Sequence, residues 1–227
     1  MKYKVVIFDL DNTLIDFDQM EIGSFNETLQ AQNIPISSNL FMAYQEINKE
    51  LWQGLEQKKY KKEEILTLRF EKLFQAYEIE ASAEKTNQMY LGNMVNHLTM
   101  IEGAYDILKA IKGKVTLVCL TNGVLEAQRS KLEKSDLNSY FDEVIISDEV
   151  GHHKPEVEIF QHMIKKIGSY EKSEMIMIGD SLSSDIQGAV NFNIKSVWFN
   201  HLSKAYDGPR IFDYEIKKLK SLENILF

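Results

Sequence analysis

The sequence predicts an α/β protein whose core is a Rossmann-like, doubly wound parallel sheet, with an α-helical cap domain inserted into it. Three observations support this prediction. Five short runs rich in valine and isoleucine recur along the 227 residues. Segments with helical patterns separate the later runs, and a stretch of about a hundred residues between the first two runs has no strand pattern.

The five apolar runs are mostly continuous rather than alternating, as expected for parallel strands that are buried on both faces. They predict strands at residues 5–8, 115–120, 144–147, 175–178 and 196–199. Helices are predicted before the later four strands, in the stretches GAYDILKAI, LEAQRSKLEKSDL, EIFQHMIKKIG and SDIQGAVNF. This alternation is typical of a doubly wound sheet, and residues 214–227 are expected to add a short edge strand and a last helix.

The long segment after the first strand predicts the helical cap. Apolar side chains recur at helical spacing over Leu40–Leu55 and again over Leu66–Tyr77. Ser37 and Ser82 stand at expected helix N-caps, and Pro35 fits a break between the first two cap helices. The predicted domains are residues 17–97 for the cap and residues 1–16 with 98–227 for the core.

The composition excludes several classes of partner. The chain has 34 acidic and 26 basic residues and a net charge of −8, which argues against a nucleic-acid polymer, since such polymers bind basic surfaces. No apolar run approaches the roughly 18 residues that cross a bilayer, and Asp9 interrupts the N-terminal run. We therefore expect a cytoplasmic protein without a membrane partner, as a monomer or a weak homodimer. The single cysteine, Cys119, is expected to be a buried apolar filler.

Four aspartates follow the first predicted strand in the stretch FDLDNTLIDFD. Two carboxylates as close as Asp9 and Asp11 repel each other unless a cation or a shared proton neutralises them. The crowding therefore predicts a metal, a proton or much exposure to water. A strand-to-turn cap is the alternative, because aspartate favours turns. Asp16 and Asp18 are expected to be solvated hinge residues.

Polar clusters follow four of the predicted strands. They are DLDNT, the TNG of residues 121–123, the GHHKP of residues 151–155 and the GDSLSSD of residues 179–185. Sites in open α/β sheets form at the carboxyl ends of the strands, so we expect these clusters to meet. His152 and His153 have no accompanying cysteine or histidine cluster, and we expect loop residues there rather than zinc ligands.

The ordered motifs D-x-D-x-T, T-N-G, K-P and G-D-S-x-x-x-D resemble those of the haloacid dehalogenase-like hydrolases along essentially the whole chain. The helical insertion directly after the first motif is similar to the cap of that family. The TNG motif and finer features at Asn48–Trp52, Arg69–Phe70 and Phe141–Gly151 resemble the branch that contains bacterial pyrimidine nucleoside 5'-monophosphatases.

The resemblance implies a two-step phosphoryl transfer. Asp9 would attack phosphorus and form an aspartyl-phosphate, which divides one hard displacement into two easier ones. Asp11 would protonate the leaving oxygen and then activate the hydrolytic water. Dehalogenases of the family lack this second aspartate, so its presence favours phosphate chemistry.

The resemblance also implies a Mg²⁺ cofactor. The carboxylates of Asp9 and Asp180 and the main-chain carbonyl of Asp11 would hold the ion, with waters completing its octahedron. With Asp185, the site would hold four carboxylates against the one ammonium group of Lys154, and this excess would repel a phosphate dianion. The divalent cation offsets most of that excess.

The remaining motif residues are expected to bind phosphate or to support the carboxylates. Phosphoryl oxygens would be held by Thr121 and the amides of Asn122 and Gly123, while Lys154 would stabilise charge in the transition state. Asp185 would pair with Lys154 or support the metal, and alternatively Asp180 and Asp185 cap a helix. Hydrogen bonds to the carboxylates are expected from Thr13 and Ser181.

In the cap, Trp52 is a candidate for stacking on the substrate, with Asn48, Lys49 or Arg69 making polar contacts. A core position for Trp52 is the alternative, because Leu51 and Leu55 lie on or near the same helical face.

The sequence thus predicts a Mg²⁺-dependent phosphomonoester hydrolase whose cap closes over a small phosphorylated metabolite. By resemblance the substrate is a nucleoside 5'-monophosphate, with pyrimidines first. A sugar phosphate or phosphoglycolate is the alternative within the same chemistry. A hydrolytic 2-haloacid dehalogenase, a receiver-type signalling module and a non-catalytic binding protein are the alternatives from other classes.

Overall fold

The computed structural model describes all 227 residues. The chain forms two compact units. The first unit comprises residues 1–17 and 99–227, and the second comprises residues 18–98. None of the helices combines the length and the apolar character that crossing a bilayer requires.

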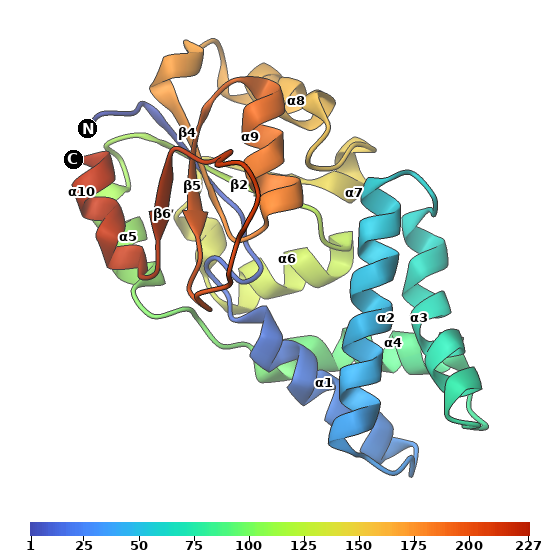
Figure 1. Cartoon of the computed structure of the whole chain (residues 1–227). Coiled ribbons are helices and arrows are strands. Elements are labelled where there is room, and N and C mark those ends of the chain that lie inside the picture. The colour runs from blue at the N-terminus through green and yellow to red at the C-terminus, as the bar shows by residue number, and fades with distance from the viewer. The chain divides into compact units, whose positions relative to one another are not determined.

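The first unit contains a six-stranded sheet in which every pair of neighbours is parallel (Figure 1). Its strands are β1 (Val5–Phe8), β2 (Thr116–Thr121), β3 (Glu143–Ile146), β4 (Met175–Gly179), β5 (Lys195–Phe199) and β6 (Tyr214–Ile216). Their order is β3-β2-β1-β4-β5-β6. The chain runs outward from β1 to β3 and then returns to β4 on the other side of β1. The order therefore reverses between β1 and β4, which is where open α/β sheets place their sites.

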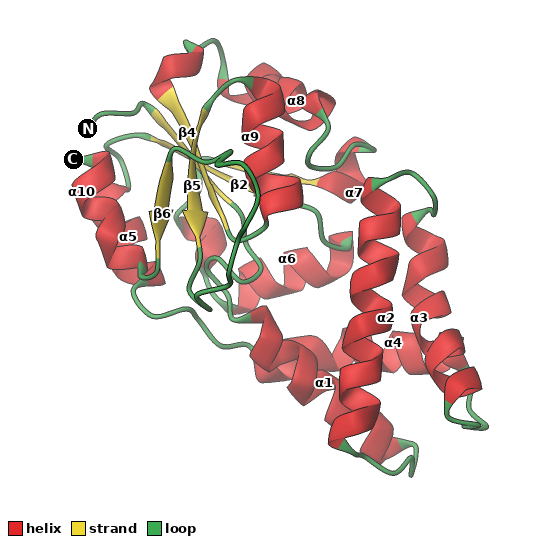
Figure 2. Ribbon diagram, in the orientation of Figure 1, coloured by secondary structure: helices red, strands yellow, loops and turns green.

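Helices cover the sheet on both faces (Figure 2). They are α5 (Ala104–Ile111), α6 (Leu125–Lys134), α7 (Ser147–Val150), α8 (Val157–Ile167), the π-helical turn η4 (Leu182–Ile186), α9 (Gln187–Phe192) and α10 (Glu223–Leu226), with short 3-10 turns at Leu137–Ser139, Lys172–Glu174 and Leu219–Leu222. On one face, Phe160 of α8 and Phe192 of α9 join a buried apolar cluster with Val5 and Ile7 of β1. Because β1 is the central strand and is fully buried, the residues that follow it have fixed positions.

The second unit consists of helices. They are α1 (Phe17–Ala31), whose first residue belongs to the first unit, α2 (Ser38–Glu56), α3 (Lys62–Ala76) and α4 (Ala83–Asn93), followed by a 3-10 turn at Met94–His97. Buried aromatic rings from all four helices pack together, including Phe25, Tyr44, Phe70 and Tyr90. The predicted N-caps are confirmed, because the side chains of Ser37 and Ser82 accept hydrogen bonds from the first turns of α2 and α4.

The predicted fold class is confirmed, with strand ends that differ from the prediction by one residue at most. Two local features were not predicted. A single helical turn, α7, follows β3 directly, and the helix after β4 begins as the π-helical turn η4. In the second case the Ser181 side chain caps the turn by accepting from the Ser184 amide, so the helix starts at Leu182.

Candidate active site

Three of the predicted polar clusters meet at the carboxyl edge of the sheet because their strands are neighbours in register. Phe8 of β1 pairs with Cys119 of β2 on one side and with Ile178 of β4 on the other. Asp9, Thr121 and Asp180 therefore lie at the ends of adjacent strands at similar heights. The first unit alone brings these residues together.

Asp9 is nearly buried, with 7% of its surface exposed. Its amide donates to the carbonyl of Ile178, which fixes the backbone just beyond β1. Lys154 Nζ lies 2.5 Å from Asp9 Oδ1, and the Thr13 hydroxyl donates to Oδ2 at 3.4 Å. The carboxylate is thus held in one orientation at the end of the central strand.

Lys154 lies at the centre of the site with 1% of its surface exposed. Besides Asp9, its ammonium group contacts the carbonyl oxygen of Leu120 at 2.6 Å and Asp185 Oδ1 at 2.7 Å. Burial disfavours the charged amine, but the carboxylates of Asp185 and Asp9 outweigh burial and raise the pKa of Lys154. The side chain is therefore a permanent cation between two carboxylates.

Carboxylate oxygens of Asp9, Asp180 and Asp185 all lie within 4.8 Å of one another. Burial, and next the nearby charge of Asp185, raise the pKa of Asp9 to about 7. Burial and then the charges of Asp185 and Asp9 raise the pKa of Asp180 well above its ordinary value. One ammonium group does not neutralise this cluster. Three converging oxygen donors with excess negative charge fit a small hard dication such as Mg²⁺.

The loop after β4 is shaped around Asp185, which is 1% exposed. The Ser181 amide donates to Asp185 Oδ2 at 3.0 Å, while the Ser181 hydroxyl caps the following turn instead of binding a carboxylate. A Cβ atom at Gly179 would collide with the Asp185 side chain, so only glycine lets the backbone lie this close to that carboxylate. The indole of Trp198 donates to the carbonyl oxygen of Asp180 at 2.9 Å.

Asn122 performs a task that its motif position did not reveal. Its side-chain amide donates to the carbonyl oxygen of Lys154 at 2.8 Å, and its Oδ1 accepts from the Lys154 amide at 2.8 Å. This reciprocal pair ties the loop after β2 to the loop that carries the buried lysine. The backbone of Lys154 is therefore positioned by Asn122, while the neighbouring Thr121 is buried at the end of β2.

Asp11 lies in a different environment from Asp9. Its carboxylate is not part of the three-carboxylate cluster and instead meets two side chains of α6, Lys131 and Gln128. Sequence reasoning missed both residues. They stand three residues apart, on the face of α6 that also buries Leu132, so polar residues occupy positions where the helical pattern expects apolar ones. With Lys131 counted, the site holds four carboxylates and two buried ammonium groups, and a single dication would neutralise it.

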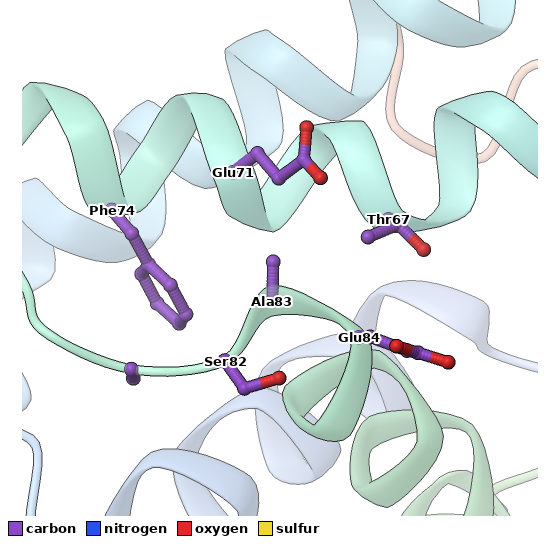
Figure 3. Close-up of a pocket in the computed structure, with 7 residues that line it drawn as sticks. Thr67, Glu71, Phe74, Ser82, Ala83 and Glu84 are labelled. Carbon is purple, nitrogen blue, oxygen red and sulfur yellow. The ribbon is translucent and has the colours of Figure 1, made fainter.

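Trp52 belongs to the second unit, where it is half-buried against a cluster of Leu51, Leu55 and Ile65. The ammonium group of Lys62 lies 6.0 Å from the centre of its ring. A pocket in the same unit is lined by parts of α3 and α4 (Figure 3). Its lining contains Glu71 and Glu84 and no basic side chain, so it does not suit a phosphate ester.

The two adjacent histidines lie in the loop before Lys154, as predicted. His152 is exposed and contacts Glu156 at 3.2 Å through Nδ1. Ligand atoms of His152, Glu156 and Glu158 lie within 4.8 Å of one another, and apart from His153 no histidine or cysteine accompanies them.

The chain is similar to known proteins along most of its length. The model of the haloacid dehalogenase-like hydrolase family matches residues 6–199. The chain is 31% identical to the HAD-hydrolase YfnB of Bacillus subtilis over 99% of this chain and 96% of that protein. It is 34% identical to the pyrimidine 5'-nucleotidase PynA of Streptococcus pneumoniae, over 88% of this chain and 85% of the relative. The chain is 29% identical to the pyrimidine 5'-nucleotidase YjjG of Escherichia coli, over 100% of this chain and 99% of that protein.

Solved structures show the same architecture. The crystal structure of YfnB, described as bound to magnesium, superposes with a TM-score of 0.93 over 100% of this chain and 99% of that chain, at 30% identity. The L-2-haloacid dehalogenase of Xanthobacter autotrophicus has a TM-score of 0.73 at 17% identity, covering 99% and 98%, which shows a shared fold alone. The family model, which matches most of the chain, and the relatives together show that this chain is an enzyme of the haloacid dehalogenase-like hydrolase family.

Proposed function

We propose that this enzyme is a phosphomonoester hydrolase that works through an aspartyl-phosphate on Asp9. The observation that carries the proposal is the separation of two nearby carboxylates into different environments. Asp9 is buried beside Lys154 in the acidic cluster, whereas Asp11 contacts α6. Two titratable groups with such different surroundings suit two different roles, nucleophile and acid–base.

The proposed reaction has two chemical steps, and both use Asp9 and Asp11. An oxygen of Asp9 forms a bond to phosphorus while the bond from phosphorus to the ester oxygen breaks, and Asp11 gives its proton to that departing oxygen. In the second step Asp11 takes a proton from water, whose oxygen attacks phosphorus and releases inorganic phosphate from Asp9. Thr121, Asn122 and Gly123 would face the phosphoryl oxygens through hydroxyl and amide groups, and Lys154 would balance their charge.

Mg²⁺ fits the donor set and, when bound, would supply positive charge against the phosphoryl oxygens. We assign it to the carboxylates of Asp9 and Asp180 and the main-chain carbonyl of Asp11, with Asp185 close by. Asp185 also forms an ion pair with Lys154 at 2.7 Å. It therefore holds the buried ammonium group in place as well as adding a carboxylate to the acidic cluster.

For the substrate we propose a nucleoside 5'-monophosphate, with pyrimidines preferred. Two relatives named as pyrimidine 5'-nucleotidases, which match 88% and 100% of this chain, support this choice. We further propose that the second unit acts as the cap and that Trp52 contributes apolar surface to the base. A sugar phosphate or phosphoglycolate is the second candidate within the same chemistry.

The test is phosphate release from thymidine, uridine and purine monophosphates, sugar phosphates and phosphoglycolate, with Mg²⁺ and with EDTA. We expect metal-dependent release that is selective for pyrimidine monophosphates. Release from sugar phosphates alone would overturn the nucleotidase assignment and keep the chemistry, whereas no release from any ester would overturn both. Replacing Trp52 by leucine should raise KM for the preferred nucleotide and leave KM for p-nitrophenyl phosphate within about twofold.

A further inference from the structure

The carboxylate of Asp11 is held by two side chains from one helix. Lys131 Nζ lies 2.7 Å from Oδ1 and 2.9 Å from Oδ2, and the side-chain amide of Gln128 donates to Oδ2 at 3.0 Å. Both residues come from α6, more than a hundred positions along the chain from Asp11. The carboxylate therefore has a defined direction even though about a quarter of its side chain is exposed.

Lys131 is an unusual residue to find in this place. Only 2% of it is exposed, and its ammonium group lies 4.8 Å from the centre of the Phe17 ring. Lysine is rarely buried, because removing an ammonium group from water costs free energy that one ion pair seldom returns. An apolar side chain at this position would pack without that cost. Stability alone therefore does not account for a lysine here.

Gln128 connects Asp11 to the loop that follows β2. The same side-chain nitrogen that donates to Asp11 donates to the Thr121 hydroxyl at 2.6 Å. A Cβ atom at Gly123 would collide with the Gln128 side chain, so the glutamine lies directly against this loop. Its Oε1 is buried and has no hydrogen-bond partner in the protein. A buried, unpartnered oxygen at this point is explained if substrate or water completes its bonding.

We infer that Lys131 and Gln128 are positioning residues that hold Asp11 in line with the phosphoryl site. The inference rests on the proposed function, in which Asp11 gives a proton in the first step and takes one in the second. Oδ2 is bound by both side chains, whereas Oδ1 is bound by Lys131 alone. Both oxygens of the carboxylate are therefore held by side chains of α6. Since both steps need the same carboxyl direction, one rigid clamp serves both.

The main test is Lys131→Met, which keeps the length of the side chain and removes the ammonium group. We expect kcat for thymidine monophosphate to fall by about 10- to 100-fold, part of the usual contribution of a general acid–base group, with KM changed by less than about threefold. Lys131→Arg should restore part of kcat. Lys134→Met is the matched control, because Lys134 is exposed in the last turn of the same helix.

A second substrate separates positioning from a structural role. p-Nitrophenyl phosphate releases a phenolate that needs no proton, so its first step should keep its rate in Lys131→Met while the second step slows. Rapid mixing should then show a burst of about one equivalent of p-nitrophenol per enzyme. Gln128→Leu should behave in the same way. A structural role would instead lower the folded fraction and reduce the rates for both substrates equally, without a burst.

The outcomes distinguish a failure of the positioning role from a failure of the proposed phosphatase function. If wild-type enzyme releases phosphate and Asp11→Asn is impaired, but Lys131→Met retains kcat within about threefold, the positioning role is overturned and the proposed function stands. An equal loss on both substrates without a burst also overturns it. Absence of phosphate release by the wild-type enzyme would overturn the proposed function, and the positioning role with it.

Discussion

The ammonium group of Lys154 lies 2.5 Å from the carboxylate of Asp9, although 145 positions of sequence separate the two residues. The loop that carries Lys154 follows α7, and Asn122 ties it to the end of β2, which lies beside β1 in the sheet. A second ion pair joins Lys154 to Asp185 at 2.7 Å.

Asp9→Asn should abolish turnover and leave the fold intact. Asparagine has nearly the shape of aspartate but cannot form the acyl-phosphate bond. We expect kcat to fall by at least about 10³-fold, a loss typical of removing a nucleophile. The measurement is phosphate release, with circular dichroism and thermal unfolding as evidence of folding. Residual activity of a few per cent, with contamination excluded, would contradict the assignment of the nucleophile.

Asp180→Asn should stabilise the metal-free protein and remove its response to Mg²⁺. Burial and the neighbouring carboxylates raise the pKa of Asp180 well above its ordinary value, so its charge is unfavourable without a cation. For the wild type, Mg²⁺ at about a hundred times its Kd should raise the free energy of unfolding by about 2.7 kcal/mol. Thermal unfolding in Mg²⁺ and in EDTA measures both effects. Asp207→Asn is the control, because Asp207 is exposed. An unchanged Mg²⁺ response in Asp180→Asn would contradict the assignment of Asp180 as a metal ligand.

Asn122→Ala should cost both stability and activity. The substitution removes two hydrogen bonds with the peptide of Lys154, each of which contributes about 1 kcal/mol, so the free energy of unfolding should fall by about 2 kcal/mol. Because the freed loop carries Lys154, kcat should fall as well. Urea unfolding and steady-state kinetics provide the measurements. Asn138→Ala, on the surface, should change neither, and wild-type kinetics in Asn122→Ala would show that the tether is dispensable.

The second unit should lose stability as the pH rises from about 4.5 to 7. Glu21 is buried, and burial raises its pKa from 4.5 to about 7, although Gln45 and Arg69 favour the charged form. A carboxyl group with a raised pKa binds more protons in the folded state, so its contribution is complete below pH 4.5 and is lost through pH 7. The loss should be roughly 3 kcal/mol.

Glu21→Gln should remove most of this dependence on pH. The uncharged amide can still accept from Asn48, which donates to Glu21 at 3.0 Å in the wild type. Urea unfolding of a Trp198→Phe background, followed by Trp52 fluorescence, reports on the second unit alone. Glu46→Gln on the exposed face of α2 is the control and should keep the wild-type slope. A flat profile in the wild type would rule out the shifted pKa.

The fold was predictable because its strands are short continuous apolar runs, which are typical of parallel strands buried on both faces of a sheet. The run at residues 5–8 is fully buried, and it forms β1 as predicted. The helix after β4 was predicted less well, since the π-helical turn depends on how the Ser181 side chain caps it, which the apolar pattern does not encode.

That Asp9, Thr121 and Asp180 would lie close together was predictable, because each stands at or directly after a strand end and the sheet brings strand ends together. Gln128 and Lys131 were not predictable from motifs, because they reach Asp11 from the body of a helix. Only three-dimensional packing shows that this face of α6 turns toward the site. The side-chain pairing of Asn122 was hidden for a similar reason, since its partner is the backbone of a loop 32 residues away.

The two buried lysines also affect how a substrate first meets the enzyme. Lys131 and Lys154 are both enclosed and paired with carboxylates, so little of their charge is felt far from the protein. The chain as a whole carries a net charge of −8, and an approaching phosphate dianion is therefore repelled until it is nearly in contact. Added salt screens that repulsion within about 10 Å at 0.1 M. The rate of substrate association should therefore rise with ionic strength, whereas it falls with ionic strength in an enzyme that attracts its substrate electrostatically.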